Sequence, residues 1–451
     1  MNENICAIST SLGVGAISIV RCSGPDVIKI VSEVFKGKDL NKVNTHTINY
    51  GHIIYNGEII DEVLVSVMKK PKTFTKEDIV EINCHGGISS TNKVLEILII
   101  KGMRLATPGE FSKKAFLNGR IDLIEAEGIN DLILAETDEQ RKYAINREMG
   151  NLSKLIINNR KILVELQAKL EVNFDYPEEA DNIEMTHELV RKELLKIKEN
   201  LEVLLNSSRD GKIVREGIDV AIVGKPNVGK SSILNHLLDE EKAIVTDIAG
   251  TTRDIVEGSI TLSGIKLNLI DTAGIRKTDD IVEKIGVDKS LEMTEKADLV
   301  IFVFNNNEEI SDEELSLLNK IKNVQKIVFI NKSDLQSKID EKDLKKYAII
   351  YGNTIEPDGL ETLKAEIIKM FKLDEIKTKN YNFLSNSRQS ALVSSALNSV
   401  NEALKSVENE VPLEMIAADI KEAFDTLGEI IGKSYNEELL DELFSNFCLG
   451  K

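Results

Sequence analysis

The sequence predicts three folding units of two classes: an N-terminal α/β domain, a helical bundle built from two separate segments, and a doubly wound α/β domain inserted between those segments. Strand-like alternation dominates residues 1–118, and a helical period governs 119–215 and returns at 376–451. Strands alternate with helices over 216–375, as in a doubly wound sheet. The 451 residues, 42% of them hydrophobic, suffice for about three ordinary domains.

Net charge and cysteine positions limit which partners, metal sites and cellular compartment can be expected. The formal charge of −18 argues against a broad surface for nucleic acid, but leaves open a local basic groove or nucleic acid held by a partner. Cys6, Cys22, Cys84 and Cys448 form no C-x-x-C pair, so neither disulfides nor a zinc site are predicted. With no apolar run long enough to cross a bilayer and no signal peptide, we expect a cytoplasmic protein without membrane attachment.

The first 118 residues alternate apolar and polar positions. Strands are predicted at 16–20, 47–55, 62–68 and 79–82, and a helix at 91–101. Arg21 and Glu81 lie in or beside such strands, where they could face a ligand or form an ordinary surface pair. The Cys84-His85 pair could indicate a metal or a nucleophile, but neither residue has a second Cys or His nearby.

Two later segments carry apolar stripes at helical spacing, which are typical of a bundle core rather than of a cofactor site. The stripes before the inserted domain are Leu155, Ile162, Leu166, Leu170 and then Val190, Leu194, Ile197, Leu201, Leu204. Those after it are Leu397, Val400, Leu404, Val407 and then Ile416, Ile420, Phe424, Leu427, Ile431. The two segments are therefore predicted to form one helical domain that the inserted domain divides.

The sequence of the inserted domain begins with a phosphate-binding pattern. Residues 224–231 read G-K-P-N-V-G-K-S, between an apolar strand at 218–223 and a helix start. Glycines let such a loop close around a phosphate, and the N–H groups at the helix start face the anion. Lys230 can reach the terminal phosphates and the Ser231 hydroxyl can hold Mg²⁺.

Three further motifs follow in order. Residues 250–254 (G-T-T-R-D) supply Thr252 for the Mg²⁺ shell, and residues 271–274 (D-T-A-G) follow a predicted strand. Residues 331–334 (N-K-S-D) follow another, and the Asp334 carboxylate can accept two hydrogen bonds from the N1 and exocyclic amino edge of guanine. Adenine lacks that donor pair, so the pattern predicts GTP rather than ATP. The predicted GTP-binding residues are Asn227, Val228, Gly229, Lys230, Ser231, Ser232, Thr246, Asp247, Ile248, Ala249, Gly250, Thr251, Thr252, Asp271, Thr272, Ala273, Gly274, Asn331, Lys332 and Asp334.

This set of motifs resembles the translation-factor-related GTPases, whose G domain has the Ras-like doubly wound fold. Residue 275 is an isoleucine, where Ras-like enzymes carry the glutamine that orients the attacking water, so the hydrolytic group must come from elsewhere. Asn227 and the loop at 246–251 match the potassium-dependent members of the class.

The chain as a whole is similar to the MnmE (TrmE) family of bacterial tRNA-modifying GTPases. The similarity rests on residues 107–111 (T-P-G-E-F), on 117–123 (L-N-G-R-I-D-L) and on the tail 448–451 (C-L-G-K). By that resemblance Asn227, Thr246, Ile248 and Thr251 would coordinate K⁺, and Glu283 would activate water. Arg253 could instead be an arginine finger, but the match places the cation there.

The resemblance also implies a folate site, homodimerisation through the N-terminal domain and partners. A formyl-tetrahydrofolate such as 5-formyltetrahydrofolate would bind Arg21, Glu81, Arg120 and Lys451, and Cys448 of the tail could assist the chemistry; from local sequence alone the tail would be a frayed end. Many members carry lysine at the position of Arg120, and the usual Ser-Ala-Lys or Ser-Ala-Arg near 350 is absent here.

The implied function is GTP hydrolysis that drives a conformational cycle. With the partner MnmG, which carries FAD, the family adds a carboxymethylaminomethyl or aminomethyl group to C5 of the wobble uridine of certain tRNAs. The folate would carry the one-carbon unit, and the two proteins would form a heterotetramer. Two alternatives are a ribosome-assembly GTPase and a regulatory module that binds GTP without turnover.

Overall fold

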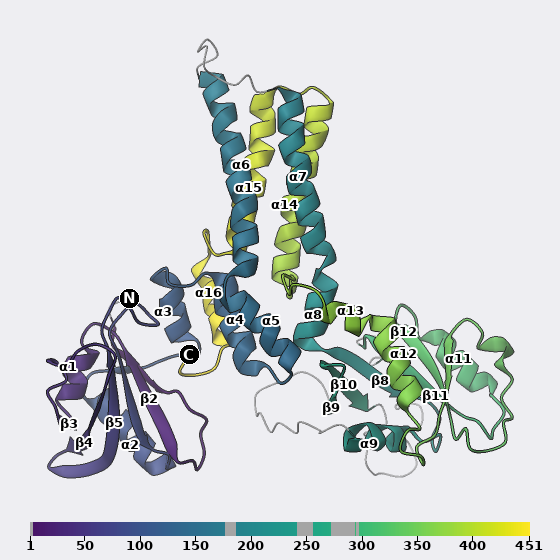
Figure 1. Ribbon diagram of the computed structural model, residues 1–451, viewed down its shortest axis with the longest axis horizontal. Coiled ribbons are helices and arrows are strands. Elements are labelled where there is room, and N and C mark those ends of the chain that lie inside the picture. Colours follow the sequence, from purple (N-terminus) through teal and green to yellow (C-terminus); the bar gives the residue numbers. More distant parts are fainter. Residues whose placement is uncertain (1–2, 176–185, 241–255, 272–293, 295–296) are drawn as a thin grey trace. The chain divides into compact units, whose positions relative to one another are not determined.

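The computed structural model divides the chain into two compact units (Figure 1). It describes residues 3–175, 186–240, 256–271, 294 and 297–451. One unit contains residues 1–130, 147–199 and 392–451, and the other contains 131–146 and 200–391. The boundaries predicted at 118/119, 215/216 and 375/376 stay predictions.

The first unit begins with a seven-stranded sheet in the order β3-β4-β5-β6-β2-β1-β7. Only β1 and β7 pair in parallel; the other pairs are antiparallel. The strands are β1 (Ile5–Ile8), β2 (Ile17–Ser23), β3 (Phe35–Lys36), β4 (Thr47–Tyr55), β5 (Glu58–Met68), β6 (Ile79–His85) and β7 (Arg104–Leu105). The predicted strands and the helix near 91–101 are confirmed, the latter as α2 (Ile88–Ile100).

Alternation along the strands gives this sheet one buried face. In β5, Val63, Val65 and Val67 are buried, and they share a core with Val94 and Ile97 of α2. Helix α1 (Val27–Ser32) contributes Val27 and Val31 to the same core. Helix α3 (Glu110–Leu117) follows β7 and leads out of the sheet.

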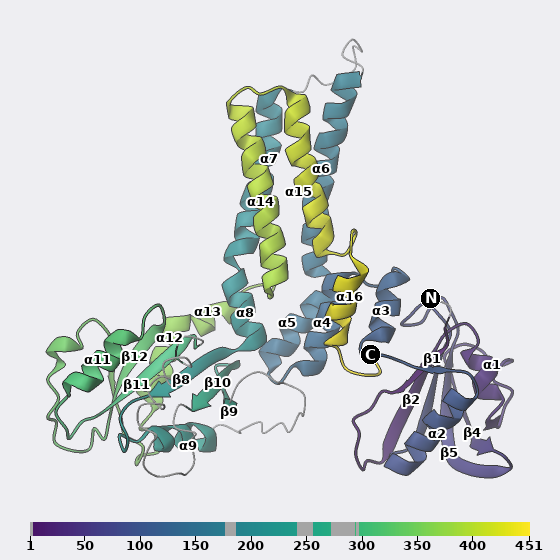
Figure 2. The same cartoon turned by 180° about the vertical axis from the view of Figure 1, so that it is seen from behind.

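Four long helices run side by side in both views (Figures 1 and 2): α6 (Asn151–Asp175), α7 (His187–Asn206), α14 (Ser387–Glu408) and α15 (Leu413–Ile430). They belong to this unit, except for residues 200–206 of α7 and 387–391 of α14, which belong to the other. The predicted stripe of α7 is confirmed, because all five of its members are buried. The stripe proposed for α6 is wrong at its start. Leu155 is 38% exposed, and Leu152, Ile156 and Leu163 are buried instead. The buried positions alternate steps of four and three residues, at Leu152, Ile156, Asn159, Leu163, Leu166 and Leu170. Leu155 and Ile162 of the predicted stripe each lie one residue before a buried position.

Shorter helices connect the bundle to the sheet. Helix α4 (Leu123–Leu134) contributes Leu123 to a hydrophobic cluster that also contains Phe116 of α3. Leu440 and Phe444 of α16 (Glu437–Ser445) belong to the same cluster. Because α16 comes from the end of the chain, this cluster draws the last residues to the N-terminal sheet.

The second unit is a six-stranded sheet in the order β13-β12-β11-β8-β10-β9. Its strands are β8 (Ile218–Val223), β9 (Val256–Leu262), β10 (Ile265–Asp271), β11 (Leu299–Asn305), β12 (Gln325–Asn331) and β13 (Ala348–Tyr351), all parallel except β9. The helices are α8 (Ser208–Glu216), α9 (Lys230–Glu240), α11 (Asp312–Lys320), α12 (Glu361–Phe371) and α13 (Leu373–Lys377). This confirms the doubly wound class predicted for the inserted domain.

Helix α5 (Asp138–Glu148) packs almost entirely within the second unit. The Tyr143 ring stacks on the Phe383 ring with the two ring centroids 6.3 Å apart, and the Tyr143 hydroxyl donates to the Phe383 carbonyl. Across the described part of the chain, every helix is too short or too polar to span a bilayer.

Candidate functional site

The phosphate-binding pattern forms a loop between β8 and α9. Gly229 has φ +100°, and a Cβ on it would lie 2.2 Å from the Asn331 amide nitrogen, so only glycine fits there. The Lys230 ammonium donates to the Gly224 and Lys225 carbonyls, at 2.8 Å each. Ser231 and Ser232 are exposed in the first turn of α9. The loop therefore offers an ammonium and a helix N-terminus on one side.

The guanine-type motif at the end of β12 is tied directly to this loop. The Asn331 side chain donates to the Val228 carbonyl at 2.8 Å, and Lys332 donates to the Asn227 carbonyl at 3.3 Å. Asn331 is 1% exposed, and its side-chain oxygen has no hydrogen-bond partner among the described residues. Asn227 is exposed, with φ +65°. The two motifs therefore form one site at the carboxyl edge of the sheet.

Asp334 is exposed at this edge, and neighbouring segments hold its loop. The Ser333 N–H donates to the Gly352 carbonyl at 3.1 Å. Asn306, after β11, donates from its backbone to Asn331 (2.9 Å) and from its side chain to the Leu335 carbonyl (2.8 Å). The sequence left the contacts of the loop near 350 unassigned; the structure places that loop beside Asp334.

The buried Asn353 side chain shapes the loop near 350. Its oxygen accepts from the N–H groups of Ile355 (3.1 Å) and Glu356 (2.8 Å), and its nitrogen donates to the Glu356 carboxylate. The Asn353 side chain thus closes this turn. The Ser-Ala-Lys or Ser-Ala-Arg pattern that is usual near residue 350 gives no indication of such a turn.

Several predicted residues lie outside the described residues. They are the first-switch residues 246–252, Arg253, the second-switch residues Thr272, Ala273, Gly274 and Ile275, and Glu283. The backbone of Asp271 ends β10, opposite Ile222 of β8, next to the strand that leads into the phosphate loop.

A second group of predicted residues meets on the N-terminal sheet. Arg21 and Glu81 are cross-strand partners, and the Arg21 Nε lies 2.8 Å from the Glu81 Oε1. The Arg21 Nη1 also donates to the Gly450 carbonyl at 2.9 Å, and Ser9 donates to the same oxygen at 3.1 Å. The structure therefore brings Arg21, Glu81 and the chain's last residues together.

The tail is docked, and the frayed-end alternative is wrong. The N–H groups of Gly109 and Phe111 donate to the Cys448 and Lys451 carbonyls, at 3.3 and 3.2 Å. Gly450 has φ +85°, and a Cβ on it would lie 2.7 Å from the Ile8 carbonyl oxygen. Burial, followed by the nearby Arg21 charge, lowers the pKa of Lys451. The Cys448 side chain is exposed.

Arg120 contacts other groups than the Arg21–Glu81 pair does. It is exposed, and its guanidinium lies 5.0 Å from the centre of the Phe74 ring. The Arg21 guanidinium lies 5.8 Å from the Phe111 ring, and Phe74 packs against the cluster that contains Phe111. The two arginines are thus linked through an aromatic cluster rather than by a shared polar contact.

Among the described residues, the Cys84-His85 pair has neither the exposed thiol of a nucleophile nor the further ligands of a metal centre. Cys84 is buried, and burial raises the pKa of its thiol to about 12. His85 faces outward, where Nδ1 lies 2.6 Å from Asp61, and Ser90 donates to the same carboxylate. Within the described residues there is no group of three His, Cys, Asp or Glu that could hold a metal. Sequence reasoning missed Asp61, because its partner is 24 residues away.

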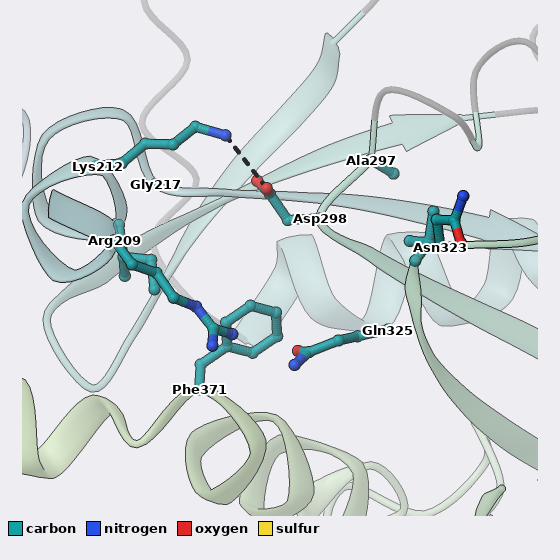
Figure 3. Close-up of a pocket in the computed structure, with 10 residues that line it drawn as sticks. Arg209, Lys212, Gly217, Ala297, Asp298, Asn323, Gln325 and Phe371 are labelled. Atoms are coloured by element: carbon teal, nitrogen blue, oxygen red, sulfur yellow. Dashed lines mark hydrogen bonds and ion pairs between the residues drawn. The ribbon is translucent and has the colours of Figure 1, made fainter. Parts of the chain in front are cut away.

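A cavity of about 350 Å³ opens at the other edge of the second unit's sheet (Figure 3). Lys212 of α8 points toward Asp298, 3.3 Å away, and the Arg209 guanidinium lies near the Phe371 ring. Asp298 and Gln325 lie where β11 and β12 begin, whereas the phosphate loop follows the end of β8. The cavity is therefore distinct from the phosphate loop.

Two family models together match nearly the whole chain. The model for the "GTP-binding protein TrmE N-terminus" matches residues 4–120, and the model for the "MnmE helical domain" matches 123–448. The "tRNA modification GTPase MnmE" of Pediococcus pentosaceus is 49% identical over 456 residues, covering 100% of this chain and 98% of that protein. The protein of the same name from Bacillus mycoides is 49% identical over 455 residues, covering 100% and 99%.

Among solved structures, the G domain of the T. maritima FeoB iron transporter is 33% identical, covering 34% of this chain and 97% of that chain, with a TM-score of 0.26. At so low a score, the doubly wound fold rests on the strand order described above.

Proposed function

This chain belongs to the family of the tRNA modification GTPase MnmE, and from that membership we propose that it hydrolyses GTP and modifies C5 of the wobble uridine of certain tRNAs. The match covers the N-terminal and helical segments as well as the inserted domain. Full-length similarity of this kind favours tRNA modification over the ribosome-assembly alternative, which would not need the N-terminal sheet.

The observation that best supports a GTP site is the hydrogen bond between the two nucleotide motifs. Because Asn331 donates to Val228, the loop that would hold phosphates and the loop that would read the base have a fixed separation. Lys230 would contact the phosphates, and Asp334 would accept from N1 and the exocyclic amine of guanine. The unpaired Asn331 oxygen is a further acceptor at the same edge.

Two ions complete the proposed site. Mg²⁺ would bind Ser231 and Thr252, and K⁺ would bind Asn227, Thr246, Ile248 and Thr251; when bound, both offset charge that develops on the phosphates. Ser231 and Asn227 suit this role, because both residues are exposed at the phosphate loop and carry a side-chain oxygen. Glu283 would take the proton from the attacking water.

The proposed K⁺ dependence is tested by measuring GTP hydrolysis in K⁺ and in Na⁺ at equal ionic strength. We expect faster turnover in K⁺, and Asn227→Ala should remove the difference while nucleotide binding stays nearly intact. Glu283→Ala should slow turnover about 10²–10⁴-fold with little change in GTP affinity. Equal rates of the parent in both salts would refute the K⁺ site, and a Glu283→Ala variant as fast as the parent would reassign the base.

The proposed folate site lies where Arg21, Glu81 and Lys451 come together. A guanidinium, a carboxylate and an ammonium there fit the carboxylates and the amino-pyrimidine edge of a formyl-tetrahydrofolate such as 5-formyltetrahydrofolate. Arg120 would approach the ligand from the side of Phe74. When bound, the folate would supply the one-carbon unit; the residues of this chain would hold and orient it.

We further propose that the protein works in the cytoplasm as a homodimer, in a heterotetramer with MnmG, which supplies FAD. The acidic chain suits an arrangement in which MnmG provides most of the tRNA contacts. Mass spectrometry of wobble uridines in tRNA from cells that lack this protein tests the whole assignment. We expect loss of the C5 group, and unchanged nucleosides would refute the assignment.

A further inference from the structure

Asn306 contacts both ends of the guanine-type motif. It is the residue after β11 and is 3% exposed. Its N–H donates to the Asn331 carbonyl at 2.9 Å, where the motif begins, and its side-chain amide donates to the Leu335 carbonyl at 2.8 Å, one residue after the motif ends. The Lys338 N–H donates back to the Asn306 carbonyl at 2.8 Å. One buried residue therefore holds the chain on both sides of Asp334.

The position of Asp334 depends on that hold. Asp334 is exposed, so the direction of its carboxylate follows from the backbone that carries it. The Leu335 N–H donates to the Lys332 carbonyl at 3.0 Å, which closes a turn around Asp334. The Asn306 amide holds the carbonyl at the far end of this turn. Without the amide, Leu335 would be free to move, and Asp334 would move with it.

The Asn306 side chain is only half satisfied, which indicates that its donor is the useful half. Its Oδ1 is buried and has no hydrogen-bond partner among the described residues. A buried acceptor without a partner lowers stability, and an apolar side chain of similar size would avoid that cost. The bond from the Asn306 Nδ2 to the Leu335 carbonyl is what an apolar side chain could not supply.

We propose that Asn306 is a positioning residue for guanine recognition: its side-chain amide fixes the turn that carries Asp334 and so directs the carboxylate at N1 and the exocyclic amino group of guanine. This inference rests on the proposed GTP site. It assigns a role to a residue outside the nucleotide motifs, and that role is exerted through Asp334.

The test compares the affinities of the full-length protein for GDP and for inosine diphosphate (IDP), measured by isothermal titration calorimetry with Mg²⁺. IDP lacks only the exocyclic amino group, so the ratio of the two dissociation constants reports one of the two bonds to Asp334. A bond to a charged acceptor predicts a preference of the parent for GDP of about 10- to 150-fold. Asn306→Ala should lower this preference about tenfold. General damage to the site would instead weaken both nucleotides equally, because they share the phosphate contacts.

Asn305→Ala is the matched control. Asn305 is the neighbouring buried asparagine, and its side chain accepts from the Asn307 N–H at 3.2 Å and donates to the Glu308 carboxylate. Because these contacts lie within its own turn, the preference for GDP should stay at the parent value. If Asn306→Ala does not fold, the isosteric Asn306→Asp replaces it. The aspartate keeps the shape but removes the donor to Leu335, so the same fall is expected.

A parent-like preference in Asn306→Ala or its replacement would overturn the inference, and so would an equal fall in Asn305→Ala. Asp334→Ala alone should abolish the preference, and adding Asn306→Ala should change the ratio no further. A further change would show that Asn306 acts without Asp334, which also overturns the inference. A parent that binds GDP and IDP equally, or an Asp334→Ala variant that keeps the preference, would instead refute the proposed recognition of guanine by Asp334. The two failures are therefore separable.

Discussion

The close approach of the tail to the N-terminal sheet predicts a strong effect of Gly450→Ala. The new Cβ would lie 2.7 Å from the Ile8 carbonyl oxygen and 2.8 Å from the Ser9 Cα, and φ +85° is unfavourable for alanine. The tail can relieve the clash only by moving away, which breaks the bonds that Arg21 and Ser9 donate to the Gly450 carbonyl.

The expected magnitude follows from those bonds. A hydrogen bond from a charged donor contributes about 1.5–3 kcal/mol and a neutral one about 0.5–1.5 kcal/mol. Their loss would make docking of the tail about 2–4 kcal/mol less favourable, which reduces the docked-to-undocked ratio roughly 30- to 1,000-fold. The folding of the sheet itself should change little, because its strands do not depend on the tail.

Hydrogen–deuterium exchange of the segment 107–112 measures this ratio. The N–H groups of Gly109 and Phe111 donate to tail carbonyls, so their exchange should accelerate in Gly450→Ala. Gly102→Ala is the matched control: φ is +98° there, but no atom lies within 4 Å of the added Cβ, so only backbone strain is introduced. Unchanged exchange in Gly450→Ala, or equal acceleration in the control, would refute the reasoning.

Three further predictions concern other sites. Asp334→Asn should weaken GTP and shift preference toward xanthosine triphosphate, as competition binding would show; retained GTP selectivity would move base recognition elsewhere. Glu127→Ala should lower unfolding free energy by about 3–5 kcal/mol in thermal or urea melts, because it leaves the fully buried Arg147 guanidinium, 2.6 Å away, without that carboxylate. The hydrogen bond to Asp61 raises the pKa of His85, so the pair's stabilisation is complete below the usual histidine pKa and is lost as pH rises through the raised one. NMR titration of the His85 ring should show this pKa falling in Asp61→Asn, and no change would contradict it.

Local patterns predicted the elements of the fold well. The phosphate loop, the alternating strands of the N-terminal sheet and the stripe of α7 each depend on spacing within one segment. The stripe of α6 was misplaced at Leu155 because several phases of an apolar helix look alike until the partner helix is known.

Contacts between distant segments were harder to predict. The Ser311–Glu314 capping box is visible in the sequence, but nothing there indicates that Lys225 reaches it across 89 residues of chain. The docking of Gly450 against Ile8 and Arg21 likewise depends on α16, whose packing carries the tail to the sheet. The family resemblance pointed to Arg21 and Lys451 together; spacing alone did not.

The division of the bundle by an inserted domain has a consequence for how the chain is made. Helix α6 (Asn151–Asp175) packs along α15 (Leu413–Ile430), and more than two hundred residues separate them. At a synthesis rate of about 5–20 residues per second, α6 leaves the ribosome roughly 12–48 s before its partner. During that interval its apolar side is uncovered, while the nucleotide domain, whose strands are contiguous in sequence, can already fold. A nascent chain in this interval therefore exposes apolar surface that the finished fold buries, and such surface favours aggregation.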